Sequence, residues 1–254
     1  MDEMLLLIDA GNTRVKWALA PGHAQPGDWI AHGAALHAEL DALPAAWQAH
    51  RVTRAIVSNV AGADLRARLG AQLGSIAVEW FASSTERAGL VNGYREPARL
   101  GCDRFAAAIG ARALAPGQAL VVATCGTATT VDAVTSDGRF LGGMILPGLA
   151  LMAGALARNT AQLPQAAPGM APPPLFADNT NDAIVSGCLS AQAGAIERAV
   201  AGHGGAACIL SGGAAPYVAP ALKVAHKLVD NIVLVGLHAV ARAGVAHGGA
   251  KDGS

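Results

Sequence analysis

Three short turns combine glycine with hydroxyl or acidic residues, and each of them follows a run of apolar residues. The turns are Asp9–Thr13, Gly126–Thr130 and Ser211–Ala214. Glycine lets backbone N–H groups turn outward, while carboxylate, amide and hydroxyl side chains add metal ligands and hydrogen-bond donors. These residue types predict a phosphate cradle, with a Mg²⁺ ion held through Asp9.

The first turn has a second interpretation, because Asp, Asn and Gly also favour the tip of a β-hairpin. The repetition favours the phosphate cradle, since a nucleotide clamped between two duplicated domains needs several such turns at strand ends. The sequence has no GxxxxGK[ST] loop, no GxGxxG after a strand, no GxSxG and no HExxH. Another kind of nucleotide site is therefore required.

A candidate catalytic carboxylate lies in Gly101-Cys-Asp-Arg104, at the start of an Ala-rich stretch with helical spacing that runs to Leu114. Transfer of a phosphoryl group to an alcohol needs a carboxylate that orients the hydroxyl and takes its proton. Asp103 is that candidate. The alternative is a structural one, in which Asp103 caps the helix or stabilises its first turn.

The elements that must position these residues alternate between strands and helices. Strands are expected at 4–8, 14–19, 54–60, 119–123, 129–134 and 207–211, and helices at 45–50, 63–73, 102–114 and 181–200. The strand, turn and strand around Gly11 recur around Gly126, which indicates an internal duplication. We therefore expect an α/β protein with two domains, 1–116 and 117–254. Residues 163–177 are expected to form an irregular proline-rich loop and 244–254 a disordered tail.

Composition excludes several classes of function. Of the 254 residues, 52% are hydrophobic, and 18 basic residues balance 18 acidic ones. This balance gives no broad positive field for nucleic acid. The four cysteines lie far apart without ligand spacing, and no apolar run is long enough to be a signal or membrane segment. We expect a cytoplasmic protein that binds neither nucleic acid nor membrane.

Five segments occur in an order that resembles a known family. DAGNTRVK, GxDR, GTATTVD, GGMILPG and SGGAA are similar to the phosphate-1, substrate, phosphate-2 and adenosine motifs of type III pantothenate kinases, members of the acetate and sugar kinase/Hsp70/actin superfamily. The match covers most of the chain. The resemblance implies two duplicated RNase H-like (actin-like ATPase) domains with mixed sheets and a nucleotide cleft between them. It also implies ATP- and Mg²⁺-dependent phosphorylation of pantothenate to 4′-phosphopantothenate, the first step of coenzyme A biosynthesis.

The resemblance also implies residue roles, with Asp103 as the general base. The implied ATP- and phosphate-binding residues are Asp9, Ala10, Gly11, Asn12, Thr13, Arg14, Val15, Lys16, Gly126, Thr127, Thr129, Gly212 and Gly213. The implied substrate-binding residues are Tyr94, Gly101, Cys102, Asp103, Arg104 and Thr180, with Arg104 on the substrate carboxylate and Thr180 reaching in from a partner subunit. Two alternatives stay open: Tyr94 as a packing aromatic, and Asp178–Asp182 as an N-capping loop.

The sequence departs from the family pattern at two positions. Many members have Asp two residues before the GTATT glycine, where it helps to hold a monovalent cation, and here that residue is Thr124. We therefore expect no strong requirement for K⁺ or NH₄⁺. Asp132 follows the motif and is a second candidate metal ligand, with a solvated hairpin acid as an equal alternative. Val235 stands where relatives often carry Glu, which leaves a polar role for that segment unsupported.

A homodimer with a shared active site is also expected. The segment 146–159 is apolar on too many sides for a helix with one buried face, and the proline-rich loop lacks the pattern to cover it. A second subunit is the economical cover. The alternative is a helix buried wholly within the second domain. For the function, the alternatives are a superfamily kinase or phosphatase for another small substrate, such as a sugar or polyphosphate, and an accessory factor for transcription without kinase activity.

Overall fold

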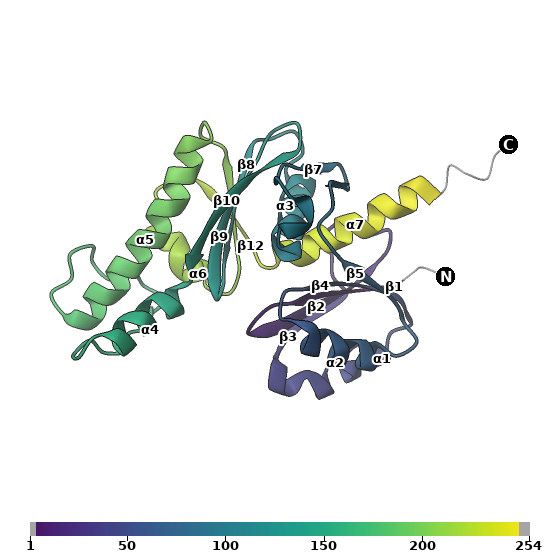
Figure 1. Cartoon of the computed structure of the whole chain (residues 1–254), viewed down its shortest axis with the longest axis horizontal. Coiled ribbons are helices and arrows are strands. Elements are labelled where there is room, and N and C mark those ends of the chain that lie inside the picture. Colours follow the sequence, from purple (N-terminus) through teal and green to yellow (C-terminus); the bar gives the residue numbers. More distant parts are fainter. Residues whose placement is uncertain (1–3, 249–254) are drawn as a thin grey trace. The chain divides into compact units, whose positions relative to one another are not determined.

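The chain forms two compact units in this computed structural model, which describes residues 4–248. Unit 1 comprises Met1–Pro116 together with Ile232–Ser254, and unit 2 comprises Gly117–Asn231. Figure 1 shows the elements of both units along the chain.

Unit 1 is built on a mixed five-stranded sheet in the order β3-β2-β1-β4-β5. Its strands are β1 (Met4–Ala10), β2 (Arg14–Pro21), β3 (Ala31–Leu36), β4 (Val52–Asn59) and β5 (Ala77–Phe81). β1, β2 and β3 pair antiparallel, whereas β1, β4 and β5 pair parallel. β1 is central and buried from Leu5 to Ala10, which matches the continuous apolar run that a strand covered on both faces needs.

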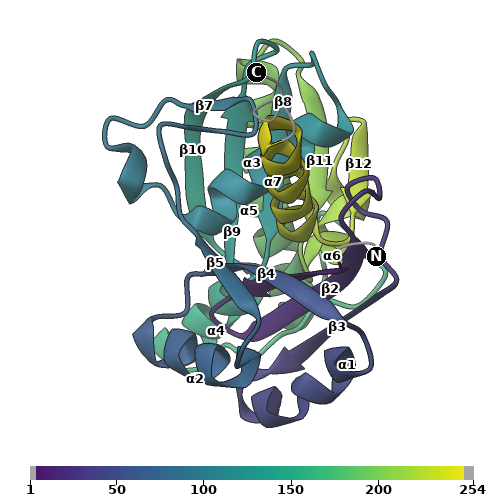
Figure 2. The same ribbon diagram turned by 90° about the vertical axis from the view of Figure 1, so that its right-hand side faces the viewer.

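Helices cover both faces of the unit 1 sheet (Figures 1 and 2). On one face, Leu6, Ile8 and Ala10 of β1 pack with the 3₁₀ helix η1 (His37–Ala42), α1 (Pro44–Gln48) and α2 (Ala63–Leu73). On the other, α3 (Cys102–Leu114) and α7 (Ile232–Gly248) pack on β1 and β4. Since successive side chains of a strand alternate between faces, Asp9 lies on the α3 side. β6 (Glu86–Arg87), β7 (Leu90–Asn92) and η2 (Pro97–Arg99) fill the segment before α3.

Helices α3 and α7 cross backbone to backbone. A Cβ atom on Gly236 would lie 1.8 Å from the carbonyl oxygen of Ala106, and one on Gly110 would lie 2.4 Å from that of Ile232. Only glycine at both positions permits this approach. The crossing corrects the expected C-terminal domain of 117–254, because residues from Ile232 onward belong to unit 1. The expected disordered tail of 244–254 is corrected in part, because residues 244–248 belong to α7. Residues 249–254 lie outside the described residues.

Unit 2 repeats the topology of unit 1. Its strands are β8 (Leu120–Cys125), β9 (Ala128–Val134), β10 (Arg139–Pro147), β11 (Ala207–Ser211) and β12 (His226–Val229), in the order β12-β11-β8-β9-β10. β8, β9 and β10 pair antiparallel, and β8, β11 and β12 pair parallel. Strand for strand, β8 takes the place of β1 and β11 that of β4. The expected duplication and the two mixed sheets of an actin-like fold are confirmed.

Four helices accompany the unit 2 sheet: α4 (Leu149–Asn159), α5 (Thr180–Gly202), α6 (Ala215–Val218) and η3 (Ala219–Ala221). α5 buries Ile184, Cys188, Ile196 and other apolar residues in the core of the unit. Residues 163–177 contain neither helix nor strand, as expected. No helix within residues 4–248 has the length and apolar character needed to cross a bilayer.

α4 is not wholly buried within unit 2. It buries Leu149 and Ala153, whereas Leu151 is 42% and Leu156 is 38% exposed. Both leucines line an apolar groove of about 1010 Å³ between α4 and the first half of α5, and Thr180 lies on its wall. The alternative of a helix enclosed by its own unit is therefore wrong for the single chain.

Candidate active site

The turn after β1 is a tight hairpin closed by backbone hydrogen bonds. The N–H of Gly11 donates to the carbonyl of Arg14 over 3.1 Å, and Asp9 pairs with Lys16 across the two strands. Asn12, Thr13 and Arg14 are exposed, while Ala10 and Val15 are buried in the core. Among the expected phosphate-binding residues of this turn, those at the tip are therefore exposed, whereas Ala10 and Val15 anchor the turn in the core.

Asp9 is a buried carboxylate at the base of this turn, only 8% exposed. Burial raises the pKa of Asp9 from 3.8 to about 6, with Lys16 opposing the shift and Asp103 adding to it. The raised pKa indicates that nearby positive charge does not compensate the buried negative charge.

These features fit a Mg²⁺ ligand, since Mg²⁺ in kinases is held through one or two carboxylates together with substrate phosphates. Among residues 4–248, no group of three or more His, Cys, Asp and Glu side chains gathers closely enough to hold a metal by itself. Phosphate oxygens and water would complete the coordination around Asp9.

Asp103 lies in the first turn of α3, two residues after the N-cap Gly101. Its Oδ1 accepts a hydrogen bond of 2.8 Å from the backbone N–H of Arg104. Burial raises the pKa of Asp103, while that hydrogen bond and the charge of Arg104 lower it. The structure thus shows a first-turn acid, and the same side chain lies close enough to Asp9 to raise its pKa. Two carboxylates of unit 1 converge where β1 ends and α3 begins.

Cys102 joins the start of α3 to the end of β4. Its Sγ lies 3.4 Å from Oγ of Ser58 and donates to the carbonyl of Asn59 over 3.6 Å. Ser58 is fully buried and pairs with Asp9 across β1 and β4. Sequence reasoning missed Ser58, whose only signal is a polar residue at the end of an apolar strand. Cys102 acts here as an anchor for the helix that carries Asp103.

Arg104 and Tyr94 form a second polar pair in unit 1. Nη1 of Arg104 donates to the Tyr94 hydroxyl over 2.8 Å, and the guanidinium carbon lies 5.6 Å from the centre of the Tyr94 ring. Arg104 is only 7% exposed. Asn92 fixes the loop before Tyr94 by donating to the carbonyls of Ser84 and Pro97. A buried guanidinium held in one orientation suits the binding of a carboxylate.

In unit 2, the turn after β8 is enclosed by glycines. The N–H of Gly126 donates to the carbonyl of Ala128 over 3.0 Å, and that of Gly148 to Thr127 over 2.9 Å. A Cβ atom on Gly148 would lie 2.1 Å from the carbonyl oxygen of Gly126, and one on Gly212 would lie 2.3 Å from that of Cys125. Gly212 also has φ +96°, which favours glycine. The third glycine-rich turn thus packs directly on the second.

The predicted ligands in unit 2 differ in their exposure. Gly126, Thr127 and Gly213 are exposed, whereas Thr129 is buried in the β8–β9 pair opposite Cys125. The exposed residues are the better placed to meet a phosphate.

Asp132 and Thr124 lie within the unit 2 sheet. Asp132 is 2% exposed and pairs with Gly143, whose missing side chain leaves room for the carboxylate. The interpretation as a solvated hairpin acid is therefore wrong. Thr124 is half-buried, with Thr130 and Ser211 opposite it on the neighbouring strands. Val235, in α7 of unit 1, is 4% exposed, as an apolar packing residue should be.

Thr180 is the first residue of α5 and is exposed. The helix is capped by Asn179, whose Oδ1 accepts from the N–H of Asp182 over 3.0 Å. The N-capping interpretation of this segment is thereby confirmed. Since the cap is Asn179, the hydroxyl of Thr180 is not needed for it.

Comparison with known proteins identifies the family. The model of type III pantothenate kinases matches residues 5–202. This chain belongs to the type III pantothenate kinase family. Two members of the family are the type III pantothenate kinases of Herminiimonas arsenicoxydans, 57% identical over 251 residues, and of Janthinobacterium sp. (strain Marseille), 55% identical over 253 residues. Each alignment covers 94% of this chain and 97% of the relative.

A solved structure shares the fold. A conserved Campylobacter jejuni protein assigned to the Baf family of transcriptional activators superposes with a TM-score of 0.61 over 95% of this chain and 99% of its own. Its sequence identity is 18%, so the similarity concerns the fold alone. It gives the alternative of an accessory factor for transcription no support beyond that fold.

Proposed function

We propose that this protein transfers the γ-phosphoryl group of ATP to pantothenate, giving ADP and 4′-phosphopantothenate as the first step of coenzyme A biosynthesis. The observation that carries the proposal is the convergence of Asp9 and Asp103 in unit 1, with the pKa of both carboxyl groups raised by burial, in a chain of this family. Raised carboxylate pKa values concentrate at functional sites because a catalytic acid or base needs a pKa suited to proton transfer. The reaction draws on ATP made inside the cell, and we place the protein in the cytoplasm.

Asp103 accepts the proton in this scheme. Its carboxylate hydrogen-bonds the 4′-hydroxyl of pantothenate, and the hydroxyl oxygen forms a bond to the γ-phosphorus as the bond from that phosphorus to the β,γ-bridging oxygen breaks. The hydroxyl proton passes to Asp103, and ADP leaves with the electron pair of the broken bond. A pKa above that of an ordinary Asp makes the Asp103 carboxylate a stronger base.

Arg104 and Tyr94 bind and orient the acceptor. The guanidinium of Arg104 pairs with the pantothenate carboxylate, and the Tyr94 hydroxyl, hydrogen-bonded to the same guanidinium, keeps it in place. A fixed acceptor converts binding energy into correct alignment of the reacting hydroxyl. Gly101 and Cys102 shape the backbone beside it, and Thr180 contacts the substrate from a second subunit.

The phosphates are bound by backbone N–H groups and side chains of the glycine turns. In unit 1 these are the exposed residues of the Asp9–Thr13 turn with Arg14 and the half-buried Lys16, and in unit 2 Gly126, Thr127, Gly212 and Gly213. A bound Mg²⁺ would neutralise part of the phosphate charge, with Asp9 as its protein ligand.

We further propose that catalysis needs no monovalent cation. Thr124 offers a neutral hydroxyl where many relatives have a carboxylate, and a neutral ligand holds a cation more weakly. Turnover should be similar in potassium and tetramethylammonium buffers at equal ionic strength. A tenfold or larger increase in K⁺ would show that other groups complete a cation site.

The working unit proposed here is a homodimer. The exposed leucines of α4 and the groove beside α5 form an apolar surface of the kind that a second copy covers in a closed C₂ pair. Thr180 lies on the wall of that groove, so the same pairing would bring it near the partner's substrate site.

A panel of small alcohols tests the proposed function. Release of ADP from MgATP is measured with pantothenate, with sugars and polyols, with polyphosphate and with no acceptor. Pantothenate should raise the rate at least tenfold above every other condition. A sugar or polyol that matches or exceeds pantothenate would assign the protein to another acceptor of the superfamily.

A further inference from the structure

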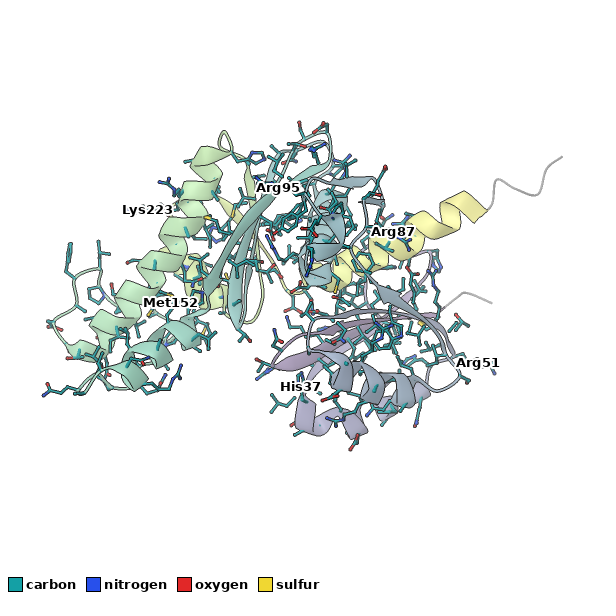
Figure 3. All side chains as sticks on the ribbon, in the orientation of Figure 1. His37, Arg51, Arg87, Arg95, Met152 and Lys223 are labelled. Atoms are coloured by element: carbon teal, nitrogen blue, oxygen red, sulfur yellow. The ribbon has the colours of Figure 1, made fainter. Side chains whose placement is uncertain are left out.

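His37, which follows β3, contacts the backbone of the Asp9–Thr13 turn. Its Nε2 lies 2.9 Å from the carbonyl oxygen of Gly11. A carbonyl oxygen only accepts hydrogen bonds, so Nε2 carries the proton and donates it. His37 is half-buried and is labelled on unit 1 in Figure 3.

The strand register explains why this histidine reaches the turn. β3 ends at Leu36, which pairs with Arg14 at the start of β2, and the carbonyl of Arg14 closes the turn by accepting from the N–H of Gly11. His37 is the next residue after that pair. The N–H of Leu36 donates to the Glu39 carboxylate over 2.8 Å, which fixes the backbone from which His37 projects.

The hydrogen bond fixes one peptide unit of the turn. A trans peptide is planar, with its C=O and N–H pointing in opposite directions. Because the carbonyl of Gly11 points to His37, the N–H of Asn12 points away from it, at an exposed residue. We propose that His37 is a positioning residue that holds the Asn12 amide toward the nucleotide phosphates. This inference rests on the proposed function, because it assumes that the turn binds them.

Loss of the bond should weaken nucleotide binding through the orientation of this peptide. Glycine at position 11 imposes little restriction on its own backbone angles, so the peptide can rotate once the carbonyl loses its partner. Rotation would replace a donor by an acceptor oxygen in front of a negatively charged phosphate. One net hydrogen bond corresponds to a change in affinity of about 3- to 10-fold.

Three substitutions separate the hydrogen bond from mere packing. His37→Gln places an amide N–H close to the position of Nε2 and should keep the bond. His37→Asn has a donor on a shorter side chain that does not reach, and His37→Leu has no donor. The matched control is His32→Leu, which removes an exposed histidine of β3 that pairs with Ala18, away from the turn.

Calorimetric titration of the full-length proteins with MgADP provides the test, because it requires no acceptor. We expect the Leu and Asn variants to bind about 3- to 10-fold more weakly than wild type, and the Gln and His32→Leu variants to remain within twofold. Recovery by Gln but not by Asn, which carries the same amide on a shorter side chain, shows that a donor must reach the Gly11 carbonyl.

Two results would overturn the inference: equal affinity in the wild type and His37→Leu, or a Gln variant as weak as the Leu variant. In both cases the wild type still binds MgADP and the proposed function stands. Absence of MgADP binding by the wild type would instead overturn the proposed function and this inference with it.

Discussion

At Asp9 and Asp103, the placement that suits the proposed reaction also lowers the stability of the fold. Asp9 is buried and Asp103 is half-buried. Loss of solvent raises the pKa of both carboxyl groups, and the charge of Asp103 raises that of Asp9 further. A buried carboxylate without full compensation destabilises the fold when it ionises. In the proposed function a cation binds Asp9 and the substrate hydroxyl binds Asp103. Each of these partners would stabilise the ionised carboxylate.

Asp9→Asn should make the protein more stable at neutral pH and inactive. The pKa of Asp9 rises from the ordinary 3.8 to about 6 in the folded chain, so between these pH values the unfolded state loses a proton that the folded state keeps. The stabilising effect of protonation therefore disappears as pH rises through about 6. Asn carries no charge, and the variant should gain on the order of 1–3 kcal/mol at pH 8 but match wild type near pH 4.

Urea unfolding of both proteins at pH 4 and pH 8, without Mg²⁺ and nucleotide, measures this difference. A variant that is less stable than wild type at pH 8 would show that the Asp9 carboxylate is well compensated within the chain.

At the scale of elements, the crossing with α7 holds α3, the helix that carries Asp103, in position on its sheet. The two backbones meet at Gly110 and Gly236 without side chains between them. A methyl group in this contact has to push one helix away, and overpacking of that kind costs about 1–3 kcal/mol.

Gly236→Ala should therefore lower the free energy of unfolding by that amount and reduce turnover, since α3 shifts with Asp103. Gly244→Ala is the matched control, because it lies in the same helix with nothing within 4 Å of the added Cβ atom, and it should raise stability by about 0.5–1 kcal/mol. Denaturant midpoints and rates of both variants provide the comparison. Equal stability changes of the two variants would contradict a close crossing.

Local pattern predicted the strands and helices next to the glycine turns and Asp103, but it missed β3, β5, β10 and β12 and did not show what each element packs against. The helices 63–73 and 102–114 have the expected bounds, because helical spacing and first-turn acids are properties of neighbouring residues. The pattern of α7 shows that it is apolar, yet not which sheet it covers, and it was therefore assigned to the wrong unit. Ser58 and His37 were missed for a related reason: each becomes relevant only through strand register with Asp9 or Arg14.

At the scale of the whole molecule, the duplicated topology explains why the glycine turns recur at equivalent strand ends. β1 and β8 hold the same place in the two sheets, so a turn that follows one has a counterpart after the other. The repeat was visible in the sequence because both turns kept a glycine. The apolar groove between α4 and α5 is separate from these glycine turns. It is the feature from which we infer a second copy of the chain.

The shared site predicts recovery of activity on mixing. Asp103→Asn removes the base, and Thr180→Arg blocks the contact proposed to come from the partner. Each variant should be a dimer by light scattering and nearly inactive alone. After co-refolding, mixed dimers contain one site with both intact residues, so part of the wild-type rate should return. No recovery from two confirmed dimers, or a fully active wild-type monomer, would contradict a shared site.

The central claim is that Asp103 takes the proton from pantothenate as ATP is consumed, and one measurement tests it most directly. Pantothenate-dependent ADP release is followed for wild type and Asp103→Asn, with the phosphorylated product identified by mass spectrometry. Asn keeps the size of the side chain and removes the proton acceptor, so kcat should fall about 10²- to 10⁴-fold with little change in stability. Formation of 4′-phosphopantothenate by Asp103→Asn at a rate near that of the wild type would contradict the account.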